Sequence, residues 1–315
     1  MAFKAYSYTE SAHMSISVHD RSVFEREKLL ASEFVDSHPC ISDSVSCPLC
    51  ESVDTESFAQ FCGAPYLRCR SCWSLFTPVS EDTISEYLKY TPLLDFRKSK
   101  KYQDVARQKR ATMWREQLFW IEFRTARYLK PLSETSIFEI GGRFEGFCDL
   151  ITAAGKSYRN FRSISDLRNS ADIILTLGSF MLEPNPVEAL CKVRKHINKD
   201  SLVFLNTKVS TGFDFLTLKG SVDSVYPYDC ATIPSIEALE LVFRKAGFDV
   251  LEISTPGTLD MVYVAENSSK LDRNDFFTRY MIEKADDSVK AEFQRLLQKG
   301  LMSSYAQLVA RVGGV

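Results

Sequence analysis

Four of the nine cysteines in this sequence form two closely spaced pairs. Each pair has two residues between its cysteines, and eighteen residues (51–68) separate the pairs, which are Cys47 with Cys50 and Cys69 with Cys72. Two intervening residues allow a tight turn to aim both sulfur atoms at one ion. Two such turns, brought together by a hairpin, complete a tetrahedral site of four thiolates. The spacing therefore predicts a zinc site.

A zinc ion with four thiolate ligands has no open position for water, so we expect this ion to be structural. Its binding would stabilise a segment too small for a hydrophobic core of its own. Four unrelated reduced cysteines are the alternative, but two correctly spaced pairs rarely coincide. A redox role is disfavoured because neither pair opens a helix after a strand. We interpret Cys62, between the pairs, as a bystander.

A second motif contains Glu139, Gly141, Gly142 and Gly146, and it follows a short apolar run. A glycine-rich turn between a strand and a helix lets the backbone approach a cofactor, and the helix offers free amides at its N-terminus. An ordinary strand-to-helix connection has a similar composition, so this turn alone is weak evidence for a cofactor.

Apolar runs and amphipathic segments alternate through the second half of the chain. This alternation predicts an α/β fold with a largely parallel sheet covered on both faces. The predicted strands are 136–140, 160–165, 172–177, 201–205, 248–254 and 261–265, and the predicted helices are 146–154, 186–197, 236–246 and 274–299. A further helix is predicted over 22–34, and 81–130 is charged and helical up to Pro131.

The overall composition is that of an ordinary globular protein, with 45% hydrophobic and 25% charged residues. A net charge of −2 provides no basic field that would attract nucleic acid or an acidic membrane. We find no apolar run of membrane-spanning length and no secretory signal, so we expect a cytoplasmic protein. The predicted organisation is an extension (1–44), a zinc ribbon (45–80), a helical linker (81–130), a Rossmann-like domain (131–265) and C-terminal helices (266–315).

The order of these features resembles the zinc-ribbon class I S-adenosylmethionine (SAM) methyltransferases of sugar and polysaccharide biosynthesis. The resemblance covers about residues 45–312. It is carried by the cysteine pairs, the segment 96–127, the glycine turn, the strand 172–177 with residues 182–186, the segment 195–203, the Gly-Phe turn at 246–250, and residues 255–260 and 301–304. It implies a class I methyltransferase sheet, SAM as cofactor, and a nucleotide-linked sugar or glycan as acceptor.

The sequence also departs from that family. Its glycines follow Glu139 by two, three and seven positions, and Arg143 and Phe144 interrupt the usual spacing. Pro184 replaces the histidine of a Leu-Glu-His element, and Asp229-Cys230 replaces a Glu-His pair. Only twenty-five residues (147–171) separate Gly146 from the next buried strand, where the resemblance implies a further helix and strand. We therefore expect a sheet short of one strand.

Candidate ligands of SAM lie where the strands end, because open parallel sheets bind ligands at their carboxyl edge. We assign Glu139, Gly141, Gly142 and Gly146 to this site, with Asp166 as a candidate for the ribose. Residues 178–180 and 206–208 end two further strands. Ser179 and Phe180 are candidate cofactor contacts, although an aromatic residue after a buried strand often belongs to the core. A surface turn is an equal alternative for Asp166.

Catalytic residues are not defined by any motif, since methyl transfer needs positioning and at most a base. Tyr226 and Asp229, in the loop before the helix 236–246, are the candidates, with a packed or solvated loop as the alternative. Two functions follow. The first is a SAM-dependent methyltransferase acting on a nucleotide-linked sugar or glycan. The second is a catalytically inactive methyltransferase-like binding or scaffold protein, the partner of an active enzyme or a homo-oligomer.

Overall fold

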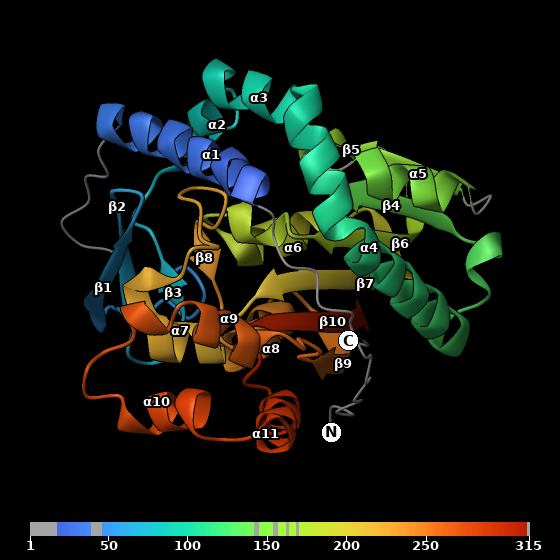
Figure 1. Ribbon diagram of the computed structural model, residues 1–315. Coiled ribbons are helices and arrows are strands. Elements are labelled where there is room, and N and C mark those ends of the chain that lie inside the picture. Colours follow the sequence, from blue (N-terminus) through green and yellow to red (C-terminus); the bar gives the residue numbers. More distant parts are fainter. Residues whose placement is uncertain are drawn as a thin grey trace.

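The computed structural model describes residues 18–38, 46–141, 145–153, 157–161, 164–167 and 170–313. Its centre is a six-stranded sheet with the order β5-β4-β6-β7-β10-β9 (Figure 1). The strands are β4 (Ser136–Ile140), β5 (Ser157–Phe161), β6 (Ala171–Leu177), β7 (Ile197–Lys208), β9 (Phe248–Ser254) and β10 (Tyr305–Val312). β5, β4, β6 and β7 are parallel neighbours, whereas β10 is antiparallel to both β7 and β9.

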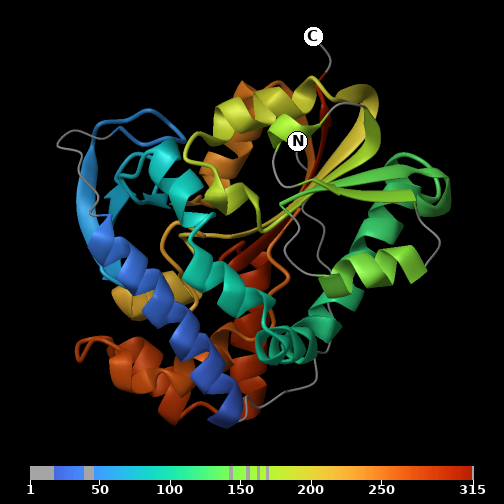
Figure 2. The same ribbon diagram turned by 90° about the horizontal axis from the view of Figure 1, so that it is seen from above.

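Helices cover both faces of this sheet, as expected for parallel strands joined by crossovers. α4 (Lys100–Tyr128) and α5 (Glu145–Ala153) pack on one face, where Trp120 and Ile151 belong to the same core as Phe204 of β7. α6 (Pro186–Arg194) and α8 (Ile236–Lys245) pack on the other face, where Leu190 and Leu239 share a core with Val203. The two layers are seen from above in Figure 2. The expected α/β class with a Rossmann-like sheet is confirmed.

Two predicted strands differ from the structure, and one observed strand, β10, was not predicted. Residues 261–265 lie in α9 (Asp260–Glu266), because a short apolar run fits either a helix or a strand. The edge strand β5 is Ser157–Phe161 rather than 160–165, in register with β4 from Ser136↔Ser157 to Ile140↔Phe161. The predicted helical C-terminus holds α10 (Phe276–Glu283) and α11 (Asp287–Lys299), but it then returns as β10 into the sheet.

The cysteine-rich segment belongs to a second, four-stranded sheet of order β1-β2-β3-β8. β1 (Thr55–Phe61), β2 (Ala64–Cys69) and β3 (Leu75–Phe76) come from this segment, whereas β8 (Thr232–Ile233) comes from the chain after β7. α1 (Val18–Ser37), α2 (Glu81–Tyr87), α3 (Thr91–Lys98) and α7 (Phe213–Leu218) pack around this sheet. The β3–β8 pairing joins the predicted zinc ribbon to the predicted Rossmann-like domain.

The short segment 147–171 has the content predicted from its length. Its described residues contain the end of α5, the strand β5 and a turn of 3-10 helix (Ile164–Asp166), and no second strand. β5 is consequently the edge of the sheet beside the glycine turn.

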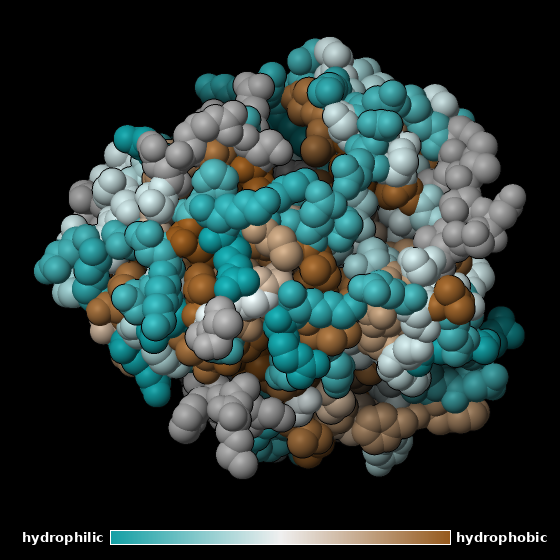
Figure 3. Space-filling view, turned by 180° about the vertical axis from the view of Figure 1, so that it is seen from behind, coloured by the Kyte–Doolittle hydropathy of each residue, from teal (hydrophilic) through white to brown (hydrophobic). Residues whose placement is uncertain are grey.

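On the face turned away from the view of Figure 1, apolar residues are scattered among hydrophilic ones (Figure 3). Among the helices described, none is long and apolar enough to cross a membrane.

Candidate functional site

The four predicted zinc ligands converge in the structure. Their sulfur atoms lie within 4.8 Å of one another, with Cys47 Sγ 3.6 Å from Cys72 Sγ and Cys50 Sγ 3.5 Å from Cys69 Sγ. Thiolates bound tetrahedrally at about 2.3 Å from a zinc ion lie roughly 3.8 Å apart, so this arrangement fits the ion.

Two similar backbone turns build the cluster. The amide of Glu51 donates to the carbonyl of Cys47, and the amide of Trp73 donates to that of Cys69, each at 2.8 Å. Glu51 and Trp73 both have positive φ angles, +68° and +62°. Each turn therefore folds its second cysteine back toward the first. Cys62 lies at the far end of this hairpin and is not part of the cluster.

The glycine turn leaves β4 at the point where the strand order reverses. The chain goes from β4 through α5 to β5 on one side, and then forms β6 on the other side of β4. Gly141 follows β4 with φ +67°, and Gly178 follows β6 with φ +84°. A Cβ atom on Gly141 would lie 2.7 Å from Cβ of Ser179, so the two turns are in direct contact.

Glu139 is the predicted acidic residue at the end of β4, and it is buried. The hydroxyl of Tyr158, on β5, donates to Oε2 of Glu139. Burial raises the pKa of Glu139 to about 7, although the hydrogen bond from Tyr158 acts in the opposite direction. Near neutral pH this carboxyl group can therefore gain or lose a proton. Tyr158 carried no predicted role, because the expected edge strand began at residue 160.

The other predicted cofactor residues are not all gathered at this turn. Ser179 is buried against it, whereas Asp166 is exposed at the end of the 3-10 turn after β5. Phe180 is 3% exposed and packs in the core near Phe243 of α8, with ring centroids 6.3 Å apart. This packing is the core position that the sequence left as the alternative, and a contact of Phe180 with the cofactor stays a prediction. Gly146 lies in the first turn of α5.

Gly142, Arg143 and Phe144 lie outside the described residues, so their predicted positions at the cofactor site stay predictions.

The candidate catalytic residues lie in a loop that packs beneath α1. The guanidinium of Arg97 forms ion pairs with Asp229 and, at 2.7 Å, with Glu27 of α1. The hydroxyl of Tyr102 also donates to Glu27, at 3.0 Å. Asp229 is therefore engaged by a partly buried cation. A role for Tyr226 or Asp229 as a base stays a hypothesis.

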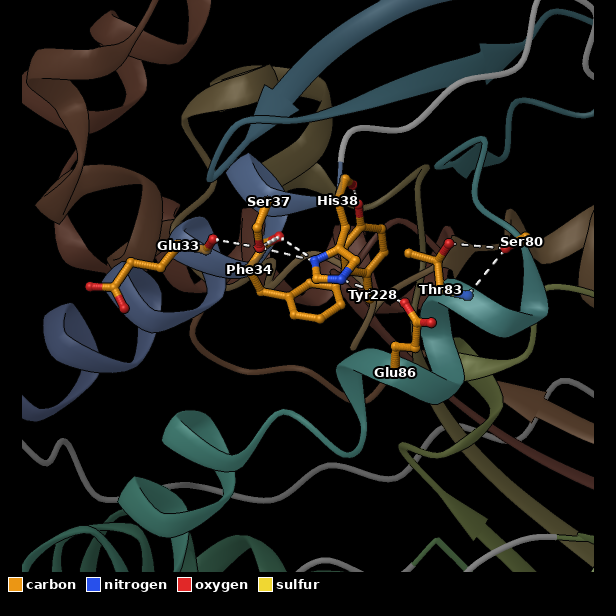
Figure 4. Close-up of polar contacts among 8 residues, drawn as sticks. All are labelled: Glu33, Phe34, Ser37, His38, Ser80, Thr83, Glu86 and Tyr228. Carbon is orange, nitrogen blue, oxygen red and sulfur yellow. Dashed lines mark hydrogen bonds and ion pairs between the residues drawn. The ribbon is translucent and has the colours of Figure 1, made fainter.

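The same loop contacts the end of α1 through Tyr228, whose hydroxyl lies 3.4 Å from the carbonyl of His38 (Figure 4). The imidazole of His38 stacks on Phe34 at a centroid distance of 4.0 Å, and its Nε2 is 3.5 Å from a carboxylate oxygen of Glu86. These contacts fasten α1 to α2.

The sequence placed Asn206 among the strand ends at the ligand-binding edge but assigned it no contact; it ends the apolar part of β7. Its side chain is fully buried, and neither Oδ1 nor Nδ2 has a hydrogen-bond partner among the described residues. Asn206 pairs with Leu177 of β6 and Gln307 of β10. It shares the α4 face with Phe204, two positions earlier on the same strand. A polar residue at the end of an apolar strand is the sequence signal that identifies it.

The polar groups and the free space around the glycine turn determine whether it could hold SAM. The amides at the start of α5 and the buried polar groups of Glu139 and Asn206 offer the contacts that an amino acid and a ribose need, whereas the amide of Gly141 already donates to the carbonyl of Phe161. The space enclosed by described residues beneath Ser179, between β6 and α6, is only about 10 Å³. That volume is near the lower limit for one water molecule, so a cofactor would have to lie outside this space, above Gly141.

Comparisons with known proteins returned structures but no sequence families. No family model and no curated protein matches this chain. Similar solved structures include a putative sarcosine dimethylglycine methyltransferase from Galdieria sulphuraria (TM-score 0.39, 11% identity, 65% of this chain and 88% of that chain). A SAM-dependent methyltransferase from Archaeoglobus fulgidus has TM-score 0.38, 14% identity and coverages of 61% and 93%.

A third structure is a complex between the Trm112 methyltransferase activator of Haloferax volcanii and a putative methyltransferase. It has TM-score 0.40 and 12% identity, and the match covers 66% of this chain and 96% of that chain. At these similarities the neighbours establish no activity for this chain.

Proposed function

We propose that this protein is a SAM-dependent methyltransferase whose donor site lies at the carboxyl ends of β4 and β6. The acceptor that we propose, a nucleotide-linked sugar or glycan, rests on the sequence resemblance alone. The zinc ion that we propose for the cysteine cluster is structural, because its four thiolates close the coordination sphere.

The reversal of strand order between β4 and β6 is the observation that carries this proposal. Connections leave two adjacent parallel strands in opposite directions there, which creates a crevice at the sheet edge. Gly141 and the start of α5 border it on one side, and Gly178 with Ser179 on the other. A ligand at this position meets the first amides of α5 and the buried carboxyl group of Glu139, whereas the amides of Gly141 and Gly178 already donate to the carbonyls of Phe161 and Asn206.

SAM supplies an electrophilic methyl group when it is bound. The residues of this chain bind and orient the donor and acceptor and exclude water from them. The first amides of α5 would hold the amino-acid part of the donor beside Gly141, and Glu139 would hold a polar group of the donor. Asn206, on the next strand but one, could orient the acceptor through an amide that both donates and accepts hydrogen bonds.

A methyltransferase-like protein without activity is the second candidate. Three observations favour it. Tyr158 already donates a hydrogen bond to the carboxyl group of Glu139, β5 ends the sheet beside the glycine turn, and the space beneath Ser179 is small. Such a protein would act as a binding partner of an active enzyme, or as a homo-oligomer in which a neighbouring chain completes the site.

Calorimetry with SAM and S-adenosylhomocysteine on the zinc-loaded protein distinguishes the two functions. Each missing polar contact to a buried ligand costs about 1–3 kcal/mol, so we expect a dissociation constant weaker than about 100 µM for the isolated chain. Glu139→Ala should weaken this binding, whereas Glu134→Ala, an exposed control, should not. Tight micromolar binding would contradict the expected loss of contacts at the β5 edge. No saturable binding would favour the inactive protein.

A further inference from the structure

A cavity of about 330 Å³ lies away from the glycine turn, between parts of the chain that are distant in sequence. Its walls come from Lys28 of α1, from the tip of the β1–β2 hairpin (60–62), from the segment 220–225 after α7, and from Lys270. α1, β1 and α7 lie on the side of the molecule opposite α5 (Figure 1). The volume is that of a site for a small molecule.

The walls of this cavity are held close together by packing. Gly220 approaches β1 so closely that a Cβ atom on it would lie 2.7 Å from Cβ of Ala59. The amide of Asp223 donates to the hydroxyl of Tyr263 at 2.7 Å, which fixes the same segment to α9. The cavity therefore does not depend on a loop that is free to move away.

Two ammonium groups and one carboxylate line this cavity. Lys28 Nζ lies 3.1 Å from Oδ1 of Asp223, and Lys270 Nζ lies 2.5 Å from Oδ2 of the same side chain. One carboxylate cannot balance two ammonium groups, so the group carries a net charge of +1. All three side chains are partly exposed, at 29% for Lys28, 48% for Asp223 and 37% for Lys270, so a ligand could reach them.

The remaining lining is apolar or neutral. Phe61, Val222 and Val225 form a small apolar floor, since they are only 2–4% exposed, and Ser221 and Gln60 provide neutral hydrogen-bonding groups. An ammonium pair beside an apolar surface suits a ligand with a compact anionic group and a less polar body.

We propose that this cavity binds the phosphate group of a small phosphate ester, whose body lies against Phe61 and Val225. The phosphate oxygens take hydrogen bonds from Lys28 and Lys270, and Asp223 competes with them for the same ammonium groups. This site is independent of the proposed donor site, because it involves none of the residues at the ends of β4 and β6.

The test uses phenyl phosphate, inorganic phosphate and phenol with the full-length, zinc-loaded protein at low ionic strength. We expect saturable binding of phenyl phosphate, weaker binding of inorganic phosphate, and none of phenol. Lys28→Met and Lys270→Met should each weaken phenyl phosphate binding by at least about tenfold, since each removes one of the two cations. Lys199→Met, at an exposed position on β7, is the matched control and should leave it within about twofold.

Two further readouts use residues of the cavity itself. Asp223→Asn should tighten phenyl phosphate binding by about threefold or more, because it removes a competing and repelling carboxylate. Bound phenyl phosphate should also slow alkylation of the Cys62 thiol, which lines the cavity, as measured by mass spectrometry. Binding that is unchanged in Lys270→Met, weaker binding by Asp223→Asn, or no protection of Cys62 would overturn the proposal. Each variant is compared with the wild type by circular dichroism, so that a folding defect is recognised.

Discussion

Gly141 and Ser179 lie in the turns that follow two neighbouring parallel strands, and a Cβ atom on Gly141 would lie only 2.7 Å from Cβ of Ser179. Carbon atoms that are not bonded do not approach so closely, since optimal contacts are at about 3.5–4.0 Å. The turns after β4 and β6 can touch only because residue 141 has no side chain. Gly141 therefore has a packing role in addition to the role at the cofactor site predicted from the sequence.

Gly141→Ala should destabilise the protein by about 2–4 kcal/mol, from the positive φ angle together with the clash. Gly178→Ala is the matched control, because its φ of +84° is similarly unfavourable but no atom lies within 4 Å of the new Cβ. That variant should lose only about 1–2 kcal/mol. Urea unfolding of the two variants measures the difference. Equal losses of unfolding free energy in the two variants would mean that the contact between the turns does not affect stability.

Adding Ser179→Gly to Gly141→Ala should recover the part of the loss that comes from the clash. The backbone strain at residue 141 should persist in the double variant. A double variant as unstable as Gly141→Ala alone would contradict the contact.

The metal prediction concerns the cysteine cluster. The purified protein should contain about one zinc ion per chain, and Cys72→Ser should lower that content and destabilise the β1–β3 hairpin region. Cys62→Ser is the control, because Cys62 lies outside the cluster. Inductively coupled plasma mass spectrometry measures the content. A reduced wild-type protein without zinc, or an equal loss in Cys62→Ser, would exclude the proposed site.

Local spacing explains which parts of this structure the sequence could predict. The four cysteines lie close together at the open end of the β1–β2 hairpin, so their spacing was sufficient to predict the metal site. β4, β6 and β7 were predicted because strands buried on both faces have largely apolar runs. The alternation of these strands with helices was likewise sufficient for the fold class.

Long-range contacts explain what the sequence could not predict. The ion pair of Arg97 with Asp229 joins residues 132 positions apart, and no local pattern records it. β10 is a strand because it pairs with β7 on one side and β9 on the other. The segment that precedes it in the sequence is helical, so no local pattern indicated this return to the sheet. α9 was mistaken for a strand because its apolar run is as compatible with a strand, while contacts of Asp260 with Ser304 and Gln294 fix the start of the helix.

Glu139 should make stability depend on pH. Its pKa is raised to about 7, above the ordinary value of 4.5, so the folded protein binds its proton more tightly than the unfolded chain does. Stability should therefore fall as pH rises from about 4.5 to 7, by up to about 3 kcal/mol for this one group. Glu139→Gln, which keeps an acceptor for Tyr158, should lose this component and be more stable than the wild type at pH 8.

The difference between the wild-type and Glu139→Gln unfolding curves, measured from pH 4.5 to 8, isolates Glu139 from other titrating groups. Glu134→Gln, at an exposed position, should show no such difference. A constant difference across this pH range would mean that Glu139 keeps an ordinary pKa.

Asn206 should show opposite effects on stability and on ligand binding. An unpaired buried polar group costs about 1–3 kcal/mol, and both side-chain atoms of Asn206 lack partners among the described residues. Asn206→Leu has a similar branched shape without those polar atoms, so it should raise the free energy of unfolding by about 1–3 kcal/mol. The same change should weaken binding of the donor or acceptor, because the ligand loses an amide that the fold itself leaves unpaired.

Asn185→Leu provides the contrast, since the side chain of Asn185 caps α6 and its loss should cost about 1 kcal/mol. Urea unfolding and calorimetry measure the two effects, and an Asn206→Leu protein that is less stable but binds normally would show that the amide serves the fold alone.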